Sequence, residues 1–278
     1  MDIKIGAVAV LYYTELKEYL STTKSFIDEI DKLIIVDNSD NPDDNLAFYQ
    51  EKIMDTKIDY HPFYSNIGIA GALNYGMNAL GNQNYKWILT MDQDSILVTS
   101  LSPYVDFIRS NPGNGKIAAL SPAYEIYGTV SPQNREPFLK VKVEQSGMLI
   151  NYDIFKNTGG FQDKYFIDYV DYAYCMELKR KHCLIYCVPE VIFRHNPGEL
   201  KRSKIFKYPF KSQSPVRYYY VYRNGLDYCI KYRDWRQMVI LLKGLVVAGC
   251  FEDKKIKNIS YILKGSKDFF RRKWGKIK

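Results

Sequence analysis

The sequence has few cysteines and lacks the marks of secretion or of a membrane span. Its five cysteines are odd in number and follow no framework spacing, and no positively charged apolar leader precedes residues 3–8, which already read as a strand. Residues 235–251 are apolar but contain Lys243 and fall short of the roughly 20 apolar residues that span a bilayer. We therefore expect a protein of a reducing cytosol that does not cross a membrane.

Two phosphate-binding motifs are absent as well. Gly68, Gly71 and Gly76 do not follow the spacing G-x-G-x-x-G, and the chain contains no G-x-x-x-x-G-K-[ST] run. These absences count against dinucleotide-binding and P-loop proteins.

The chain does contain enough apolar material for a large core, and its charge is uneven. Its 278 residues are 46% hydrophobic and 15% aromatic, which suits one large domain or a domain with an appendage. Residues 201–278 hold 21 Lys and Arg against 5 Asp and Glu, so the net charge of +8 divides into +16 there and −8 over residues 1–200. A basic part on an acidic body indicates a polyanionic partner, either nucleic acid or an anionic membrane surface.

Strand and helix patterns alternate along the first part of the chain. The expected strands are residues 3–11, 32–37, 57–60 and 85–91, and the expected helices are 16–30, capped by Thr14, then 44–54 and 69–80. Strands that are apolar throughout imply burial on both faces, so the pattern predicts an open parallel α/β sheet. Ligands of such sheets bind beyond the carboxyl ends of the strands.

Two carboxylates stand at one of these ends. Residues 86–95 form an apolar run that finishes in Asp92 and Asp94. If the strand geometry persists to its end, the two side chains point the same way and form a site for a hard cation, Mg²⁺ or Mn²⁺, with phosphate completing the shell. The alternative is an acidic turn that caps the next helix.

Polar residues also follow the other strands. Asp37 ends the second strand, Asn66 and Gly68 follow the third, and Asn74 lies on the next helix. Taken singly, these residues have ordinary structural explanations: a turn for Asp37, a surface position for Asn74, and close packing of helix on sheet for the glycines. Together with Asp92 and Asp94 they favour a nucleotide pocket.

A second acidic pair comes later in the chain. Asp168 and Asp171 lie three residues apart at the start of a helix expected over 169–181, so they are expected to share a helix face, although first-turn acids are ordinarily caps. The polar stretch 121–137 before them is read as a long loop, an acceptor-side flap.

Three basic residues complete the candidates. His195 follows the strand expected at 187–193, where it either ligates a metal, contacts a phosphate or is merely structural. Arg217 and Arg223 lie in a tyrosine-rich helical stretch, and a guanidinium such as that of Arg217 suits a diphosphate, against the alternative of plain surface charge.

Six segments, in order, resemble glycosyltransferase family 2 of the GT-A fold, in its bacterial rhamnosyltransferase-like branch. They are the opening strand with residues 35–39, then 66–76, 92–94, 166–171, 195–199 and 214–224. The resemblance covers nearly the whole chain. It implies a GT-A (Rossmann-like) α/β fold, with a mixed, mostly parallel central sheet flanked by helices and a C-terminal helical, basic extension.

The resemblance also assigns roles. Asp37 contacts the pyrimidine base, Asn66 lines the nucleotide site, Asp92 lies near the ribose and metal, Asp94 is the principal metal ligand, and Asp171 is the catalytic base with Asp168 in support. The full nucleotide-sugar set is Tyr12, Asp37, Asn66, Gly68, Asn74, Asp92 and Arg217, and the metal set is Asp94, Asp92 and His195. Two departures, Val170 and Glu177, stand where relatives carry an acid and an arginine, and they weaken the assignment of acceptor contacts but not that of the base.

The C-terminal part has a composition of its own. Residues 254–278 carry ten basic residues and one acid, Asp268, interleaved with aromatic and aliphatic side chains. A basic amphipathic helix of this kind suits the headgroup layer of anionic lipid, the alternatives being an ordinary surface helix or a nucleic-acid contact. The acidic body speaks against nucleic acid, so we expect no nucleic-acid partner.

The sequence therefore predicts an inverting, metal-dependent glycosyltransferase, peripheral on the inner face of the cell membrane. The branch resemblance suggests L-rhamnose from dTDP-L-rhamnose as the donor and a lipid-linked surface polysaccharide as the acceptor. A UDP-hexose or UDP-galactofuranose transferase and a non-catalytic nucleotide-sugar-binding scaffold remain alternatives. We expect a catalytic domain over 1–225, with a nucleotide-sugar half at about 1–98 and an acceptor half at about 99–225, and an extension over 226–278. The sequence gives no oligomeric state.

Overall fold

The chain divides into two compact units, which are described separately. The structure, a computed structural model, describes residues 3–53, 57–194, 200–202, 209–211 and 213–277. The first unit comprises Met1–Gln162 and Asp171–Asn196, and the second comprises Asp163–Val170 and Pro197–Lys278. The expected domain boundary at 225 stays a prediction.

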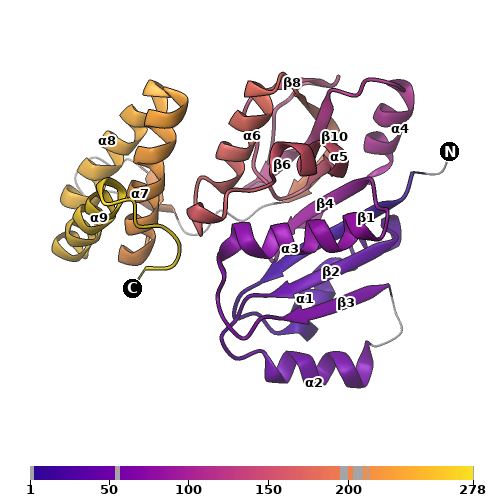
Figure 1. The fold of residues 1–278 in the computed structure, drawn as a ribbon, viewed down its shortest axis with the longest axis horizontal. Helices are drawn as coiled ribbons and strands as arrows, with labels where there is room; N and C mark the ends of the chain where they lie inside the picture. The colour runs from indigo at the N-terminus through magenta and orange to yellow at the C-terminus, as the bar shows by residue number, and fades with distance from the viewer. Residues whose placement is uncertain (1–2, 54–56, 195–199, 203–208, 212, 278) are drawn as a thin grey trace. The chain divides into compact units, whose positions relative to one another are not determined.

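A sheet of ten described strands forms the centre of the first unit (Figure 1). Its main path runs β3-β2-β1-β4-β9-β6-β10-β5, with β7 paired to β6 and β8 to β10. The elements of its first half are β1 Ile5–Leu11, α1 Leu16–Thr23, β2 Lys32–Asp37, α2 Asp43–Lys52, β3 Ile58–Pro62, α3 Gly68–Asn82 and β4 Trp87–Asp92. A 3-10 turn, η1, covers Ile27–Glu29.

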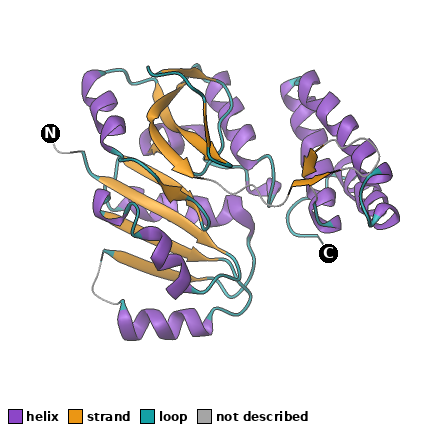
Figure 2. Cartoon of the chain, turned by 180° about the vertical axis from the view of Figure 1, so that it is seen from behind, coloured by secondary structure: helices purple, strands orange, loops and turns teal. Residues whose placement is uncertain are grey.

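The second half of the unit completes the sheet, whose strands are orange in Figure 2. Its elements are β5 Ile96–Leu97, α4 Ser102–Ser110, β6 Ile117–Ile126, β7 Thr129–Ser131, β8 Phe138–Lys140, β9 Met148–Asn151, α5 Tyr152–Thr158, α6 Val170–Arg180 and β10 Leu184–Arg194. The β1, β2, β3 and β4 strands pair in parallel, whereas β9 runs antiparallel to both β4 and β6. The expected mixed α/β sheet is confirmed, with parallel pairs among β1 to β4 and a further parallel pair of β6 with β10.

Burial on both faces of β1 explains its unbroken apolar sequence. Alternate residues, Ala7 and Ala9 among them, join the core cluster that includes residues of α1 and α4. Val8 points to the other face, where α3 crosses (Figure 1). A Cβ added to Gly76 of α3 would lie 2.4 Å from Val8 Cγ1, so this glycine allows the helix to approach the strand. The close-packing alternative is therefore correct for Gly76.

Three sequence expectations about local structure are wrong. The helix expected over 16–30 ends at Thr23, and its N-cap is Glu15 rather than Thr14. The stretch 121–137 is not one long loop, because β6 continues to Ile126 and pairs with β7 in a hairpin. The sequence of this hairpin contains Pro122 and Pro132 with polar neighbours, and this composition is typical of a loop.

The second unit is mainly helical. Its elements are the 3-10 turn η2 Asp163–Tyr165, the paired strands β11 Leu200–Arg202 and β12 Pro209–Lys211, and the helices α7 Pro215–Tyr232, α8 Trp235–Cys250 and α9 Lys255–Phe270. The helix α7 packs against both α8 and α9. None of the helices in the described part of the chain is long and apolar enough to cross a bilayer.

Candidate functional site

The segments that follow β1, β2 and β4 meet at the carboxyl edge of the parallel strands. The backbone N–H of Tyr12, just beyond β1, donates to Gln93 Oε1 at 2.9 Å. The next N–H, of Tyr13, donates to Ser39 Oγ at 2.8 Å. Because β1 lies between β2 and β4, its loop is tied to the loops on both sides. This is the edge at which ligands of such sheets bind.

Asp37 is buried at this edge and holds its loops through hydrogen bonds. Its side chain is fully buried and accepts hydrogen bonds from the N–H of Ser39 at 3.0 Å, Asn45 Nδ2 at 2.8 Å and Tyr60 Oη at 2.5 Å. Burial raises the pKa of Tyr60, and its hydrogen bond to Asp37 raises it further, so the phenol stays a donor. With three donors already on the carboxylate, a direct contact between Asp37 and a base stays a prediction.

Asn66 and Gly68 form a fixed turn between β3 and α3. Asn66 Oδ1 accepts from Asn38 Nδ2 at 3.0 Å and from the N–H of Gly68 at 2.9 Å. The N–H of Ile67 in turn donates to Asn38 Oδ1 at 2.8 Å. Gly68 has φ of +84°, a left-handed conformation that glycine adopts without a steric penalty. The turn therefore holds the start of α3 beside the end of β2.

Two exposed tyrosines stand at the same edge. Tyr12 is 45% exposed and Tyr13 is 63% exposed, and their rings meet edge to face with centroids 4.6 Å apart. Tyr13 Oη donates to Asp40 Oδ2 at 2.9 Å, and this hydrogen bond raises the pKa of Tyr13. Aromatic faces in such a position suit the stacking of a nucleobase.

Asn74 has a different position from the other predicted nucleotide ligands. Its Nδ2 donates to the carbonyl of Phe161 at 2.8 Å, and its Oδ1 accepts from the N–H of Phe161 at 2.9 Å. The side-chain amide thus pairs with one backbone residue as a neighbouring strand would, and it ties α3 to the loop after α5. A nucleotide contact by Asn74 stays a prediction.

The two carboxylates at the end of β4 do not follow strand geometry together. The strand ends at Asp92, and Gln93 and Asp94 form a turn that the N–H of Ser95 closes on the Asp92 carbonyl. The strand geometry on which a shared direction of the two side chains depended does not reach Asp94, so that shared direction stays a prediction. Asp92 is half-buried, whereas Asp94 is exposed and makes no hydrogen bond or ion pair within the described residues.

A turn that the sequence analysis missed lies against Asp92. Residues 144–147 precede β9, and Gln145 Nε2 donates to Asp92 Oδ1. The N–H of Asp92 donates to Ser146 Oγ at 3.0 Å, and Ser146 Oγ is 2.7 Å from Ser95 Oγ. The only sequence signal is the polar pair Gln145 and Ser146 before Gly147.

Asp171 and Asp92 act on a common neighbour, Tyr124 of β6. Burial raises the pKa of Tyr124 well above its ordinary value, and the charges of Glu144, Asp92 and Asp171 raise it further. Burial together with Asp171 and Glu144 likewise raises the pKa of Tyr172 to about 12. The carboxylates at the end of β4 and at the start of α6 therefore lie within electrostatic reach of one hydroxyl.

The oxygen donors at the β4 edge fit a divalent cation in part. Mg²⁺ is commonly held by one or two carboxylates, with substrate phosphates and water completing the shell, and Asp92 and Asp94 supply two. Within the described ranges no group of three His, Cys, Asp or Glu side chains could hold a metal. His195, the third predicted ligand, lies outside the described residues.

Asp168 and Arg217 form an ion pair inside the second unit. Asp168 Oδ1 accepts from Arg217 Nη2 at 3.0 Å and Nε at 3.2 Å, while its buried Oδ2 has no hydrogen-bond partner in the described structure. Asp168 and Tyr169 have φ of +64° and +65°, so both precede the helix that begins at Val170. The expectation that Asp168 shares a helix face with Asp171 is therefore wrong.

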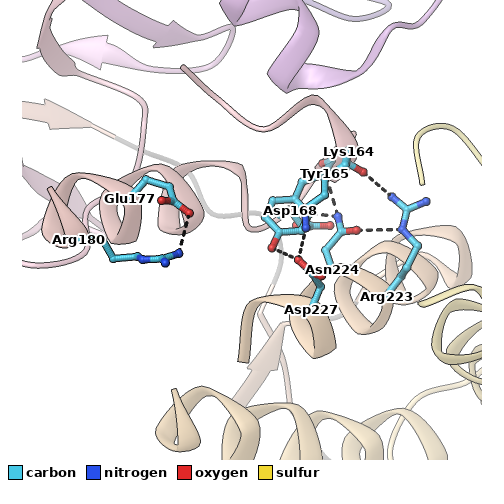
Figure 3. Close-up of polar contacts among 8 residues, drawn as sticks. All are labelled: Lys164, Tyr165, Asp168, Glu177, Arg180, Arg223, Asn224 and Asp227. Carbon is cyan, nitrogen blue, oxygen red and sulfur yellow. Dashed lines mark hydrogen bonds and ion pairs between the residues drawn. The ribbon is translucent and has the colours of Figure 1, made fainter. Parts of the chain in front are cut away.

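Two buried side chains of α7 hold the backbone before Asp168 (Figure 3). Asn224 Nδ2 donates to the carbonyls of Ile167 at 2.7 Å and Asp168 at 3.2 Å. Its Oδ1 accepts from Arg223 Nε at 2.9 Å, and Arg223 Nη2 donates to the carbonyl of Lys164 at 3.3 Å. Because Arg223 is fully buried among these contacts, it is a structural residue of this unit. Figure 3 also shows Glu177, which pairs within α6 with Arg180 at 3.7 Å.

The sequence of this chain is similar to a known family and to a known protein. The model of the family described as "Glycosyl transferase family 2" matches residues 7–156. The dTDP-rhamnosyl transferase RfbF of Shigella flexneri is 28% identical over 246 residues, which cover 81% of this chain and 79% of that protein.

Two solved structures share the fold. GalNAc-T7 with UDP, GalNAc and Mn²⁺ matches with a TM-score of 0.57 and 12% identity, over 97% of this chain and 56% of that one. S. aureus TarS matches with a TM-score of 0.50 and 13% identity, over 94% of this chain and 42% of that one. The chain thus spans about half the length of these two proteins.

Proposed function

Because the chain belongs to glycosyl transferase family 2, we propose that it is an inverting, divalent-metal-dependent rhamnosyltransferase. The proposed donor is dTDP-L-rhamnose, and the proposed acceptor is a lipid-linked surface polysaccharide. The similarity to the Shigella flexneri dTDP-rhamnosyl transferase supports the choice of donor. The observation that carries the proposal is the exposed Asp94 beside Asp92 at the end of β4, with the charge of Asp171 acting on the same half-buried tyrosine, Tyr124, as that of Asp92.

The nucleotide is proposed to bind at the carboxyl edge of β1, β2 and β4. Tyr12 offers an exposed ring for the base, and the turn of Asn66 and Gly68 is tied to the loop after β2. Asp37 shapes this edge through the hydrogen bonds that it accepts from Asn45 and Tyr60. In this arrangement Asn74 supports the site by holding α3 to the backbone of Phe161.

The metal is proposed to lie between the donor and the end of β4. Asp92 and Asp94 would hold it, with His195 as a further candidate, and a bound Mg²⁺ or Mn²⁺ would neutralise charge on the leaving diphosphate. Arg217 is the proposed cationic contact to the diphosphate, a role that suits a guanidinium with several N–H donors. In the structure these donors go to Asp168, so the contact requires Arg217 to exchange partners.

Asp171 is the proposed catalytic base. It takes the proton of the acceptor hydroxyl while the oxygen attacks the anomeric carbon, and the bond from that carbon to the diphosphate oxygen breaks with its electron pair leaving on the nucleoside diphosphate. Attack from the face opposite the leaving group inverts the anomeric centre. Asp168 is proposed to support the acceptor side.

The extension over 226–278 is proposed to bind the inner face of the cell membrane, with residues 1–225 as the catalytic domain. Trp235, Val239, Leu242 and Val246 are exposed on α8 at intervals of four, three and four residues, which places them on one helix face. Basic side chains of α9 would meet anionic headgroups. Flotation with liposomes of phosphatidylglycerol should therefore recover the full chain, and neutral phosphatidylcholine liposomes should not. Equal recovery with both would remove the electrostatic part of the proposal.

The test of the function is a donor panel with Mg²⁺ or Mn²⁺. We expect dTDP-L-rhamnose to be turned over and UDP-hexoses to be poor donors; preference for UDP-galactose, UDP-glucose or UDP-galactofuranose would instead support the alternative transferases. Binding of a nucleoside diphosphate without turnover by any acceptor would support the scaffold.

The base is tested separately. Asp171→Asn should bind the donor as the parent does and lose transfer by about 10²–10⁴-fold, the usual contribution of a general base. Normal turnover by this variant would exclude Asp171 as the base.

A further inference from the structure

Gln145 lies in the 144–147 turn, and its buried side-chain amide faces Asp92, a proposed metal ligand. The residue is 8% exposed, and its Nε2 donates to Asp92 Oδ1. Its other amide atom, Oε1, is buried and finds no donor among the described residues. A buried acceptor without a donor destabilises a fold, so such a group is better explained by function than by packing.

The turn that carries Gln145 is held from several sides. Thr90 Oγ1 of β4 donates to the Gln145 carbonyl at 2.5 Å, and the N–H of Gly147 donates to the Thr90 carbonyl at 2.7 Å. Tyr124 Oη of β6 donates to the Ser146 carbonyl at 2.7 Å. Tyr104 Oη of α4 donates to the Gly147 carbonyl at 2.9 Å. Hydrogen bonds from β4, β6 and α4 therefore hold the backbone of this turn in place.

Gly147 gives the turn its shape. It has φ of +75°, and a Cβ at this position would lie 2.8 Å from Phe193 Cδ2 and 2.9 Å from Pro122 Cγ. Only glycine fits both the backbone conformation and the space. The path of the chain at Gly147 thus brings the preceding residues against the end of β4.

We propose that Gln145 is a positioning residue of the donor site, which fixes the carboxylate of Asp92 in the orientation that receives the divalent cation. The inference rests on the proposed function, because Asp92, the residue that Gln145 would orient, is a metal ligand only under that proposal. An amide donor suits this role, since it holds one carboxylate oxygen without adding charge. The Asp94 side chain, by contrast, is exposed and has no such support in the described structure.

The test compares dTDP binding by calorimetry in Mn²⁺ and in EDTA, with UDP measured in parallel. Gln145→Met has a similar shape but no donor, so we expect the gain in dTDP affinity that Mn²⁺ provides to shrink about tenfold, as for loss of a hydrogen bond to a charged group. Affinity in EDTA should change by less than twofold. A role in folding alone would lower both affinities together or neither.

Tyr104→Phe is the matched control, because it removes one buried hydrogen bond from the same turn without touching Asp92. We expect it to resist urea about as well as Gln145→Met and to keep the full Mn²⁺ effect. If Gln145→Met keeps the Mn²⁺ effect, or if both variants lose it equally, the inference is wrong.

Gln145→Glu gives a result that misfolding cannot imitate. It places a further carboxylate at the position that now contacts Asp92, so we expect Mn²⁺ alone to bind more tightly than to the parent protein. Unchanged or weaker Mn²⁺ binding by a folded Gln145→Glu protein would overturn the inference. If the parent protein binds neither dTDP nor UDP with Mn²⁺, the proposed function itself fails, and this outcome is distinct from a failure of Gln145 alone.

Discussion

Replacing Asn74 by alanine tests whether this residue binds the nucleotide or holds the fold. The substitution removes two hydrogen bonds, 2.8 and 2.9 Å long, that pair the side-chain amide with the carbonyl and the N–H of Phe161. Each is worth about 0.5–1.5 kcal/mol, and a backbone group left without a partner costs about 1–3 kcal/mol when water does not reach it. Asn74 is half-buried, so water can replace part of the loss. We expect the free energy of unfolding to fall by about 2–3 kcal/mol.

Urea unfolding measures this loss, and calorimetry of dTDP with Mn²⁺ measures the function. Asn74→Ala should bind dTDP as the parent protein does, because these two hydrogen bonds hold the side-chain amide against Phe161. Asn78→Ala is the matched control on the same helix, since Asn78 is exposed and accepts one hydrogen bond, from Tyr152 Oη at 3.2 Å. A stable Asn74→Ala protein that no longer binds dTDP would show that Asn74 contacts the nucleotide and that the reasoning from Phe161 is wrong.

Three further predictions concern the ion pair and the thiols. Arg217→Lys loses the two-donor contact to Asp168, and because the Arg217 side chain is 45% exposed, urea unfolding should show a loss below about 1 kcal/mol. Burial raises the pKa of the Cys175 thiol to about 12, so at pH 8 a thiol reagent should modify the exposed Cys250 and spare Cys175 until urea unfolds the chain. The same shift makes the unfolded chain release the Cys175 proton first. Stability should therefore fall between about pH 9 and 12, less steeply in Cys175→Ala.

The elements with strong local signals could be predicted from sequence. The apolar runs of β1 and β2 and the period of α3 depend on residues close in the chain, and these elements lie where we expected them to within a few residues. The hairpin of β6 and β7 could not be predicted in this way. Its pairing is set by contacts across the sheet, whereas its polar and proline residues match a loop locally.

The candidate site was predictable as far as strand ends allow. A parallel sheet brings the residues after β1, β2 and β4 to one edge, and the hydrogen bonds from Tyr12 and Tyr13 show that these loops do meet. The contact between Gln145 and Asp92 could not be predicted, because it joins residues 53 positions apart and no periodicity encodes it. The hydrogen bonds of the buried Asp37 could not be predicted for the same reason, since they come from Asn45 and Tyr60, which lie on other elements.

The separation of Asp168 from Asp171 bears on which of them is the base. Left-handed backbone at Asp168 and Tyr169 is unfavourable for residues with a side chain, and the amide of Asn224 offsets this by donating to the carbonyls of Ile167 and Asp168. The turn directs one oxygen of Asp168 to two donors of Arg217, so Asp168 would have to give up an ion pair to accept a proton there. Asp171 instead begins α6, and its charge acts on Tyr124 together with that of Asp92. The ion pair of Asp168 with Arg217 therefore favours Asp171 as the proposed base.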